Sequence, residues 1–456
     1  MMDQQTRAGI ARSIGLDSTA LYAVVGKICL LSSGLVTVLL VAAFFSPEVQ
    51  GFYFTFSAVT GLQVFAELGL GIVLTNYASH EWANLELDHE RRITGDMGAL
   101  SRLTSLGNFG LRWFMVAAAV VTLVLAIGGY IFFSGAGPKP FSWKTEWLAL
   151  CVVTGLNLCL VPVTALLEGC NQVSKVYSYR ILQYLSSAIA GWAAIFAGAG
   201  LWVAAIAGLA GTFAIAIPVG LRYGSLIRQI CLLPPKASRL SWKEDIWPMQ
   251  WRIAVSWASG FLTFGLFTPV LFHYQGAVTA GQMGMTWAFV GALSSVASSW
   301  VTPKAPLFGV LVAKQKHAEL DRLFWRTTSG VAIITAIGAL GIWTFVFALT
   351  EVHHPFSNRM LAPGPTGYLL LGTLVMVLSL PMATYLRAHK REPLLGVSVV
   401  CGILTALMTC VLGRYDSAEA VAIGYFVVMI AVTPFVALIW YQRRAEWHVG
   451  PLVARP

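Results

Sequence analysis

The chain has 456 residues, of which 57% are hydrophobic and 11% are charged, and its mean hydropathy is +0.72. Soluble globular domains carry roughly 25% charged residues, so this composition excludes a water-soluble enzyme, a disordered chain and a disulfide-stabilised scaffold. The formal net charge of +10 fits basic loops beside an anionic cytoplasmic leaflet, and we expect no nucleic-acid partner.

Long apolar runs predict an all-α, polytopic membrane protein embedded in the lipid bilayer. A spanning helix needs roughly 20 predominantly apolar residues, and twelve such windows follow one another along the chain. The predicted spans are 20–45, 52–79, 110–133, 147–167, 176–197, 201–221, 246–272, 279–302, 325–349, 366–386, 393–413 and 418–441.

The distribution of lysine and arginine indicates how these spans are oriented. With a cytoplasmic N-terminus, the inner segments hold 24 of these residues, whereas the outer loops hold only Lys139, Lys144, Arg359 and Arg414. Because cytoplasmic loops carry the positive excess, both termini are expected in the cytoplasm. The first nineteen residues lack the apolar core of a cleavable signal peptide, so the first span is expected to be retained.

The loops are short on the outer side. The longest, 351–365, leaves no room for an extracytoplasmic catalytic domain. In one cytoplasmic loop, apolar residues at helical spacing lie beside arginines: Ile93, Met97, Leu100 and Leu103 with Arg91, Arg92 and Arg102. This pattern fits a helix on the membrane surface and a solvated connector equally well.

An internal repeat predicts two six-helix lobes. Features of the first half recur in order in the second: Lys27 as Arg252, Gln50-Gly51 as Gln275-Gly276, Pro162 as Pro381, and Gly208 with Pro218 as Gly424 with Pro434. The predicted lobes are 1–222 and 246–456, joined by a cytoplasmic linker at 223–245. Parallel repeats of this kind are related by a pseudo-two-fold axis along the membrane normal, around a central cavity, and are typical of transporters.

Three charged residues fall inside predicted spans: Lys27, Glu67 and Arg252. A charge at the centre of a span costs roughly 2.5–3.5 kcal/mol on insertion scales, which makes each a candidate functional residue. Lys27 and Arg252 lie at matching depths, about 10 Å from the inner end, where two cations could hold a pyrophosphate. Snorkelling to the inner surface is the alternative for both. Glu67 is too deep to snorkel and is either a structural ion-pair partner of Lys27 or a coupling site.

Polar stripes run along the helix faces that carry these charges. Ser256 and Ser259 share a face with Arg252, and Gln63 shares one with Glu67. A lipid-facing helix gains nothing from such groups, so the stripes are predicted to line the interior. The predicted substrate-binding residues are Arg252, Lys27, Ser256, Ser259, Gln63, Gln282 and Thr286.

Motifs for catalysis, cofactors or metals are not found in the sequence, which contains no HExxH, P-loop, GxSxG or Rossmann fingerprint. We therefore expect no catalytic residue, no cofactor and no metal site. Two histidines adjacent in sequence point apart on regular elements, so Glu351, His353 and His354 are not expected to bind a metal. Tryptophans near span ends are expected in an aromatic belt: Trp143, Trp147, Trp247 and Trp440. Trp257 and Trp287 lie deeper and either pack or stack on sugar rings.

Several motifs resemble the polysaccharide and O-antigen flippases of the MOP exporter superfamily. They are FSPEVQGFY at 45–53, ELGL at 67–70, AGQMGMT at 280–286 followed by Pro306 and Glu319-Leu320-Asp321, and Leu167-Glu168-Gly169 with Tyr177 and Arg180. The resemblance covers most of the chain, and it implies two six-helix lobes.

The resemblance implies a protein of the prokaryotic cytoplasmic membrane that moves a polyprenyl-pyrophosphate-linked oligosaccharide outward by alternating access. Lys27 and Arg252 occupy positions where such flippases would meet the anionic substrate. The implied partners are this lipid-linked glycan, the bilayer and other membrane proteins of polysaccharide assembly. Two other functions stay open: a cation-coupled multidrug exporter of the same superfamily, and a membrane-embedded glycan polymerase, ligase or acyltransferase.

Overall fold

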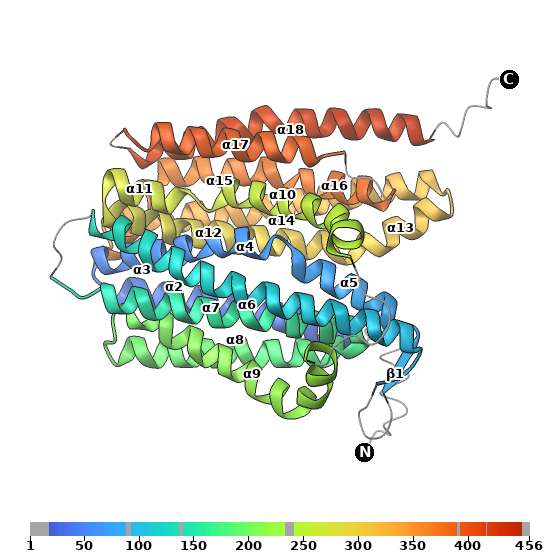
Figure 1. Ribbon diagram of the computed structural model, residues 1–456. Coiled ribbons are helices and arrows are strands. Elements are labelled where there is room, and N and C mark those ends of the chain that lie inside the picture. Colours follow the sequence, from blue (N-terminus) through green and yellow to red (C-terminus); the bar gives the residue numbers. More distant parts are fainter. Residues whose placement is uncertain are drawn as a thin grey trace, which may run out of the picture. The chain divides into compact units, whose positions relative to one another are not determined.

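The computed structural model describes residues 18–87, 93–135, 140–232, 241–389, 393–415 and 417–448, and these are almost entirely helical (Figure 1). The elements of the first half are α2 (Ser18–Phe44), α3 (Pro47–Thr60), η1 (Gly61–Gln63), α4 (Val64–Glu67), α5 (Leu70–Trp82), β1 (Leu85–Leu87), β2 (Ile93–Gly95), α6 (Met97–Ser134), α7 (Lys144–Leu167), η2 (Glu168–Gln172), α8 (Val173–Phe196) and α9 (Trp202–Cys231). Those of the second half are η3 (Trp242–Ile246), α10 (Trp247–Phe264), α11 (Phe267–Gln275), α12 (Ala277–Val301), η4 (Thr302–Lys304), α13 (Ala305–Ala313), α14 (His317–Glu351), η5 (Pro355–Arg359), α15 (Pro363–Val377), α16 (Ser379–Ala388), α17 (Leu395–Leu412) and α18 (Ala418–His448).

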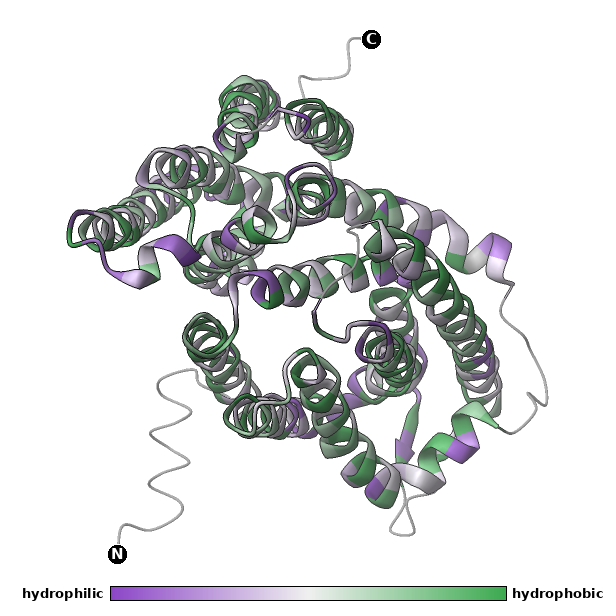
Figure 2. Ribbon diagram, turned by 90° about the vertical axis from the view of Figure 1, so that its left-hand side faces the viewer, coloured by the Kyte–Doolittle hydropathy of each residue, from purple (hydrophilic) through white to green (hydrophobic). Residues whose placement is uncertain are grey.

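The helices are long and apolar enough to cross a membrane. The described ranges contain nine such segments, or eleven when the two bent pairs, Pro47–Glu67 with Leu70–Trp82 and Gln250–Phe264 with Phe267–Gln275, each count as one span. One segment, Lys144–Phe196, contains both α7 and α8. These two helices are separated by non-helical backbone at Cys170 and Asn171. Separating these two helices raises eleven to twelve, the predicted number. Seen end-on in Figure 2, the helices are predominantly hydrophobic.

The chain forms two compact units, with boundaries between α2 and α3, inside α3 and inside α10. The N-terminal unit comprises Met1–Phe44 and Val59–Trp257, and the C-terminal unit comprises Phe45–Ala58 and Ala258–Pro456. Each bent span therefore contributes residues to both units. In the predicted lobes 1–222 and 246–456, by contrast, each span belongs to one lobe. Those lobes stay a prediction about the sequence repeat.

In the N-terminal unit, α8 packs between α2 and α9, and α6 packs against α7 (Figure 1). The indole of Trp147 is fully buried there and donates from Nε1 to the carbonyl of Leu125 (3.0 Å). Gly129 makes this possible, because a Cβ at that position would lie 2.2 Å from the indole. Trp143 is buried as well, so the prediction that these two residues belong to an aromatic belt is wrong.

The C-terminal unit has an aromatic core. Trp287 packs edge-on against Phe267 and Tyr425, with ring centroids 4.8 and 5.6 Å apart, which favours packing over sugar stacking for this residue. Trp440 is buried and stacks on Phe324 at 4.4 Å, so its predicted place in the belt is also wrong. Trp247 is exposed.

A surface helix around residues 93–103 is not formed. Ile93 belongs to β2, which pairs antiparallel with β1, and Met97 begins the 38-residue helix α6. Asp96 caps that helix by accepting hydrogen bonds from the backbone N–H groups of Gly98 and Ala99, and these bonds lower the pKa of its carboxyl. Capping is a strong helix-start signal, and it extends the span inward. Arg91 and Arg92 lie outside the described residues.

Candidate functional site

The span that carries Glu67 is broken directly after it. Leu68 and Gly69 both adopt left-handed backbone (φ 47° and 65°), and the helix axis bends by 44° between Pro47–Glu67 and Leu70–Trp82. Gly69 suits this position for two reasons: its φ is positive, and a Cβ would lie 2.2 Å from the side chain of Ile253. Broken spans of this kind recur at the binding sites of transporters, because they expose helix ends within the membrane.

Glu67 and Gln63 open into a small polar cavity of about 210 Å³ in the N-terminal unit. Its other lining residues come from α7, α8 and α9: Asn157, Leu158, Leu160, Val161, Thr164, Arg180, Gln183, Tyr184 and Ile215. The structure thus brings together two predicted residues and surrounds them with amides, hydroxyls and an arginine.

Arg180 is the cation of this cavity. Its Nη2 lies 2.5 Å from Oε1 of Glu168, in an ion pair that is partly exposed, and it also interacts electrostatically with Glu67. The tight reversal at Cys170 and Asn171 places Glu168 and Arg180 side by side, since Asn171 adopts left-handed backbone (φ 61°). Arg180 is therefore an electrostatic partner of Glu67, a role that the sequence had suggested for Lys27.

Sequence reasoning missed Arg180, although a signal was present. Arg180, Gln183 and Tyr184 fall at positions i, i+3 and i+4, which is one face of a helix. The predicted fifth span began at 176, which left Arg180 beside a cytoplasmic loop. In the structure α8 begins at Val173, so Arg180 lies seven residues in, about 10 Å along the helix.

Lys27 and Arg252 both belong to the N-terminal unit. Lys27 is half-buried on α2, whereas Arg252 is exposed on α10 with its guanidinium carbon 5.6 Å from the ring centroid of Trp251. Neither lines the cavity that contains Glu67. Their joint grip on a pyrophosphate stays a prediction, as does the role of the half-buried Ser256.

Three other predicted residues are engaged in packing. Ser259 is buried beneath α17, where its carbonyl accepts from the Thr263 hydroxyl (2.9 Å) and a Cβ on Gly402 would lie 2.7 Å from it. Thr286 is fully buried, and its hydroxyl accepts from the backbone N–H of Leu361 (3.0 Å). Gln282 donates to the carbonyl of Asn358 (3.0 Å). In this structure Ser259 and Thr286 belong to the packed interior rather than to an open cavity.

Metal-binding chemistry finds no support in the part of the chain that is described. There, no three His, Cys, Asp or Glu side chains converge as metal ligands. His354 caps η5 instead, because its Nδ1 accepts from the backbone N–H of Phe356 (3.2 Å).

The fold matches solved structures along nearly its whole length. A structure described as the inward-facing conformation of a multidrug resistance MATE family transporter of the MOP superfamily has a TM-score of 0.66 at 12% identity, covering 95% of this chain and 96% of that one. The chain has the fold of the MATE transporters.

Two further structures agree with this fold. The outward-facing conformation of a multidrug resistance MATE family transporter has a TM-score of 0.58 at 11% identity, covering 94% of this chain and 95% of that one. A MOP superfamily transporter from Pyrococcus furiosus, described as having a binding pocket of reverse polarity that suggests a different function, has a TM-score of 0.52 at 13% identity, covering 96% and 95%. No family model and no curated protein matches the sequence.

Proposed function

We propose that this protein is a transporter, not an enzyme, and that it moves a polyprenyl-pyrophosphate-linked oligosaccharide across a prokaryotic inner membrane by alternating access. The observation that supports this best is Arg180, a cation that lines the same polar cavity as Glu67. A guanidinium binds phosphate oxygens in a two-pronged geometry, and the amides and hydroxyls around it match the hydrogen-bonding groups of sugars.

The size of the cavity limits what it holds at one time. Pockets for small molecules usually measure about 300–1,000 Å³, whereas this one measures about 210 Å³. It therefore accommodates a phosphate group or a single sugar ring rather than a whole oligosaccharide. The longer glycan would pass it in sections or extend into space that opens during the transport cycle.

Glu67 gives the cavity a route to ion coupling. Two carboxylates, Glu67 and Glu168, act on Arg180. When Glu67 binds a proton, Arg180 is compensated by Glu168 alone, and the cavity becomes more favourable for an anion. In this scheme proton binding at Glu67 and binding of the anionic head group are linked, so transport depends on the protonation state of Glu67.

One observation favours a second function, a cation-coupled multidrug exporter. With Glu67 ionised, the carboxylates Glu67 and Glu168 outnumber Arg180, and a cationic drug could bind in place of an anion. The MATE structures with the same fold include multidrug resistance transporters, which adds weight to this alternative. Arg180 works against it, because this guanidinium lines the same cavity as Glu67 and repels a cationic ligand.

Transport in proteoliposomes separates the two functions. The assay follows a fluorescent polyprenyl-pyrophosphate disaccharide and, separately, a cationic dye, with Arg180→Gln and Lys175→Gln as matched variants. Lys175 is exposed on the same helix, five residues earlier. We expect wild type and Lys175→Gln to move the lipid-linked sugar and Arg180→Gln to lose at least about tenfold in rate, because a charge-assisted bond contributes roughly 1.5–3 kcal/mol.

Two controls make this result interpretable. Glu168→Gln leaves Arg180 in place, and the double variant Glu168→Gln/Arg180→Gln removes the carboxylate that Arg180→Gln would strand, so a folding defect is recognised by its rescue. Dye transport that depends on Glu67, without movement of the sugar, would replace the flippase by the exporter.

The membrane topology belongs to the same proposal. Twelve spans place both ends of the chain on one side, and the excess of lysine and arginine in alternate loops assigns that side to the cytoplasm. Lipid-linked substrates of this class are made at the inner leaflet and used outside. Membrane proteins of polysaccharide assembly are therefore the partners that this function requires.

A further inference from the structure

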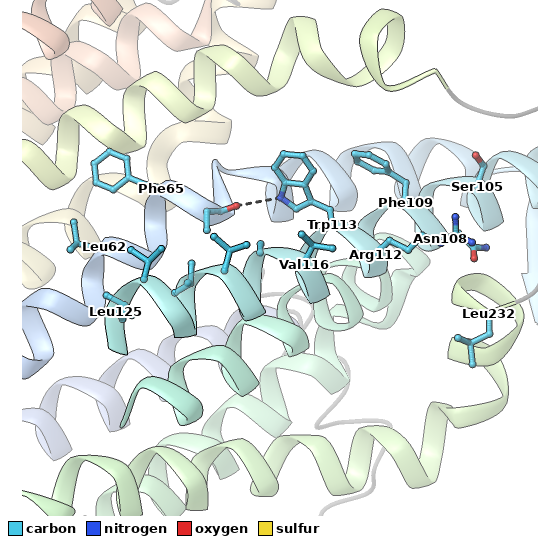
Figure 3. Close-up of a pocket in the computed structure, with 15 residues that line it drawn as sticks. Leu62, Phe65, Ser105, Asn108, Phe109, Arg112, Trp113, Val116, Leu125 and Leu232 are labelled. Carbon is cyan, nitrogen blue, oxygen red and sulfur yellow. Dashed lines mark hydrogen bonds between the residues drawn. The ribbon is translucent and has the colours of Figure 1, made fainter. Parts of the chain in front are cut away.

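A second hollow in the N-terminal unit lies outside the polar cavity and is larger than it. It is a groove of about 1030 Å³ along α6, lined almost entirely by apolar side chains, and Figure 3 shows the residues that line it. They are Leu62, Phe65, Ala66, Ser105, Asn108, Phe109, Arg112, Trp113, Val116, Ala117, Val120, Val121, Val124, Leu125 and Leu232. This volume lies at the upper end of the range for small-molecule pockets, about 300–1,000 Å³.

The groove has one polar end. Ser105, Asn108 and Arg112 lie together on α6 at that end, whereas Leu62 and Leu125 mark the apolar end (Figure 3). No ion pair joins Arg112 to a carboxylate in the described ranges. Beyond Arg112 the helix carries no charged residue up to its end at Ser134. The groove thus places a cation beside a long hydrocarbon-like surface, which is the complement of an anionic lipid.

The length of the groove distinguishes between anionic lipids. From Arg112 to Leu125 the helix rises about 20 Å at 1.5 Å per residue, while one leaflet accounts for about 15 Å, half of the hydrocarbon thickness of about 30 Å. A phospholipid whose phosphate lies at Arg112 would fill only the nearer part, because its acyl chains end at the mid-plane. A longer chain is needed to reach Leu125.

The groove and the polar cavity share one helical turn. Leu62, Phe65 and Ala66 face the groove, whereas Gln63 and Glu67 face the cavity. The carbonyl of Ala66 accepts a hydrogen bond from Nε1 of Trp113 (3.3 Å), which ties this turn to α6 (Figure 3). A chain in the groove therefore contacts the same turn that positions Glu67.

We propose that this groove holds the polyprenyl chain of the lipid-linked substrate, with its phosphate at Arg112 on the cytoplasmic side. This inference rests on the proposed function and adds to it a binding site for the lipid. The head group first docks at Arg112, and the chain stays along α6 while the sugar portion enters the polar cavity.

Photocrosslinking tests this site directly. The full-length protein, in nanodiscs of phosphatidylethanolamine and phosphatidylglycerol, is mixed with a polyprenyl pyrophosphate that carries a diazirine on its chain, and crosslinked peptides are mapped by mass spectrometry. The matched variants are Val124→Trp and Leu123→Trp, neighbours of equal exposure (60% and 61%), of which only Val124 lines the groove. We expect Val124→Trp to lower crosslinking on α6 about tenfold, since overfilling a packed site is strongly unfavourable, and Leu123→Trp to leave it unchanged.

Arg112→Gln separates head-group binding from chain binding. It should weaken binding of polyprenyl pyrophosphate about tenfold, because a charge-assisted contact is lost, and leave binding of uncharged polyprenol unchanged. Competition by added phosphatidylglycerol as strong as that by unlabelled polyprenyl pyrophosphate would overturn the proposal in favour of a phospholipid site. Displacement by tetraphenylphosphonium alone would overturn it in favour of a drug site.

The transport assay distinguishes a failure of the lipid-binding groove from a failure of the proposed flippase function. Crosslinking in the groove without sugar transport would contradict the flippase and leave a polyprenyl-binding groove in place. Sugar transport at the wild-type rate by Val124→Trp, with no crosslinks on α6, would leave the flippase in place and reject the groove as its lipid site.

Discussion

In the C-terminal unit, two glutamine side chains donate hydrogen bonds to backbone carbonyls of neighbouring segments. The buried side chain of Gln50 donates from Nε2 to the carbonyls of Gly281 (3.1 Å) and Arg359 (2.9 Å). Its counterpart in the sequence repeat, Gln275, donates to the carbonyls of Gly413 (3.2 Å) and Tyr415 (2.5 Å). In both copies of the repeat, one glutamine amide thus donates to two backbone carbonyls.

Replacing Gln50 tests this role. Gln50→Ala removes two hydrogen bonds in a buried place, and at about 0.5–1.5 kcal/mol each it should lower the free energy of unfolding by about 1–3 kcal/mol. Thermal unfolding in detergent, followed by tryptophan fluorescence, measures the change. Gln282→Ala is the matched control, because its bond to Asn358 is exposed; an equal loss in both variants would show that burial does not decide the effect.

At the scale of the element, the break in the second span shapes the candidate site. The helix that begins at Pro47 is interrupted after Glu67, because Leu68 and Gly69 both adopt left-handed backbone. The helix axis bends by 44° at this break. The carboxylate of Glu67 turns back toward the start of α5, where a Cβ on Gly71 would lie 3.3 Å from its Oε1.

Two glycine substitutions should have opposite effects on stability. Gly69→Ala places a Cβ in left-handed backbone and against Ile253, and it should destabilise the protein by at least about 1–2 kcal/mol. Gly128→Ala lies within α6, in its C-terminal part, with nothing within 4 Å of the added Cβ, and it should stabilise the protein by about 0.5–1 kcal/mol. The unfolding midpoints of both variants, measured in the same detergent, give the two changes in stability. A Gly69→Ala protein as stable as wild type would contradict the expected strain at the break.

At the scale of the whole molecule, each span must cross the bilayer, so that its two ends lie in different aqueous compartments. Helix α14 has 35 residues and rises about 50 Å, more than the 40–45 Å of a bilayer with its head groups. Lys314, just before the start of this helix, and Glu351, its last residue, are both exposed. The excess of basic residues predicts that Lys314 lies in the cytoplasm and Glu351 outside.

Cysteine labelling in whole cells checks this topology. A membrane-impermeant maleimide should label Glu351→Cys in intact cells and Lys314→Cys only after the cells are permeabilised. The wild-type chain, whose seven cysteines are all free, provides the background, and peptide mapping identifies the labelled site. Labelling of Lys314→Cys from outside would reverse the orientation and place Arg112 at the outer leaflet.

The sequence by itself determined the membrane class, the number of spans and most of their limits, because the hydrocarbon thickness dictates a minimum length of apolar chain. It also placed Gln63 and Glu67 on one helix face, since the period of 3.6 residues is local. Start and stop positions were less certain. The strong cap at Asp96 lengthened α6, and the short reversal at Asn171 made α8 begin at Val173, which places Arg180 within this helix.

Only the tertiary structure decided which polar residues meet. Periodicity shows that Ser259 and Thr286 lie on polar faces, yet it cannot show that α17 covers one and that Leu361 engages the other. In the same way Trp147 lies near a span end, but the space beside Gly129 buries it. A one-dimensional pattern records the direction of a side chain on its own helix, whereas its partner depends on how that helix packs against others. For that reason the spans could be predicted from the sequence, while the presence of Glu67 and Arg180 in one cavity and the groove along α6 required the fold.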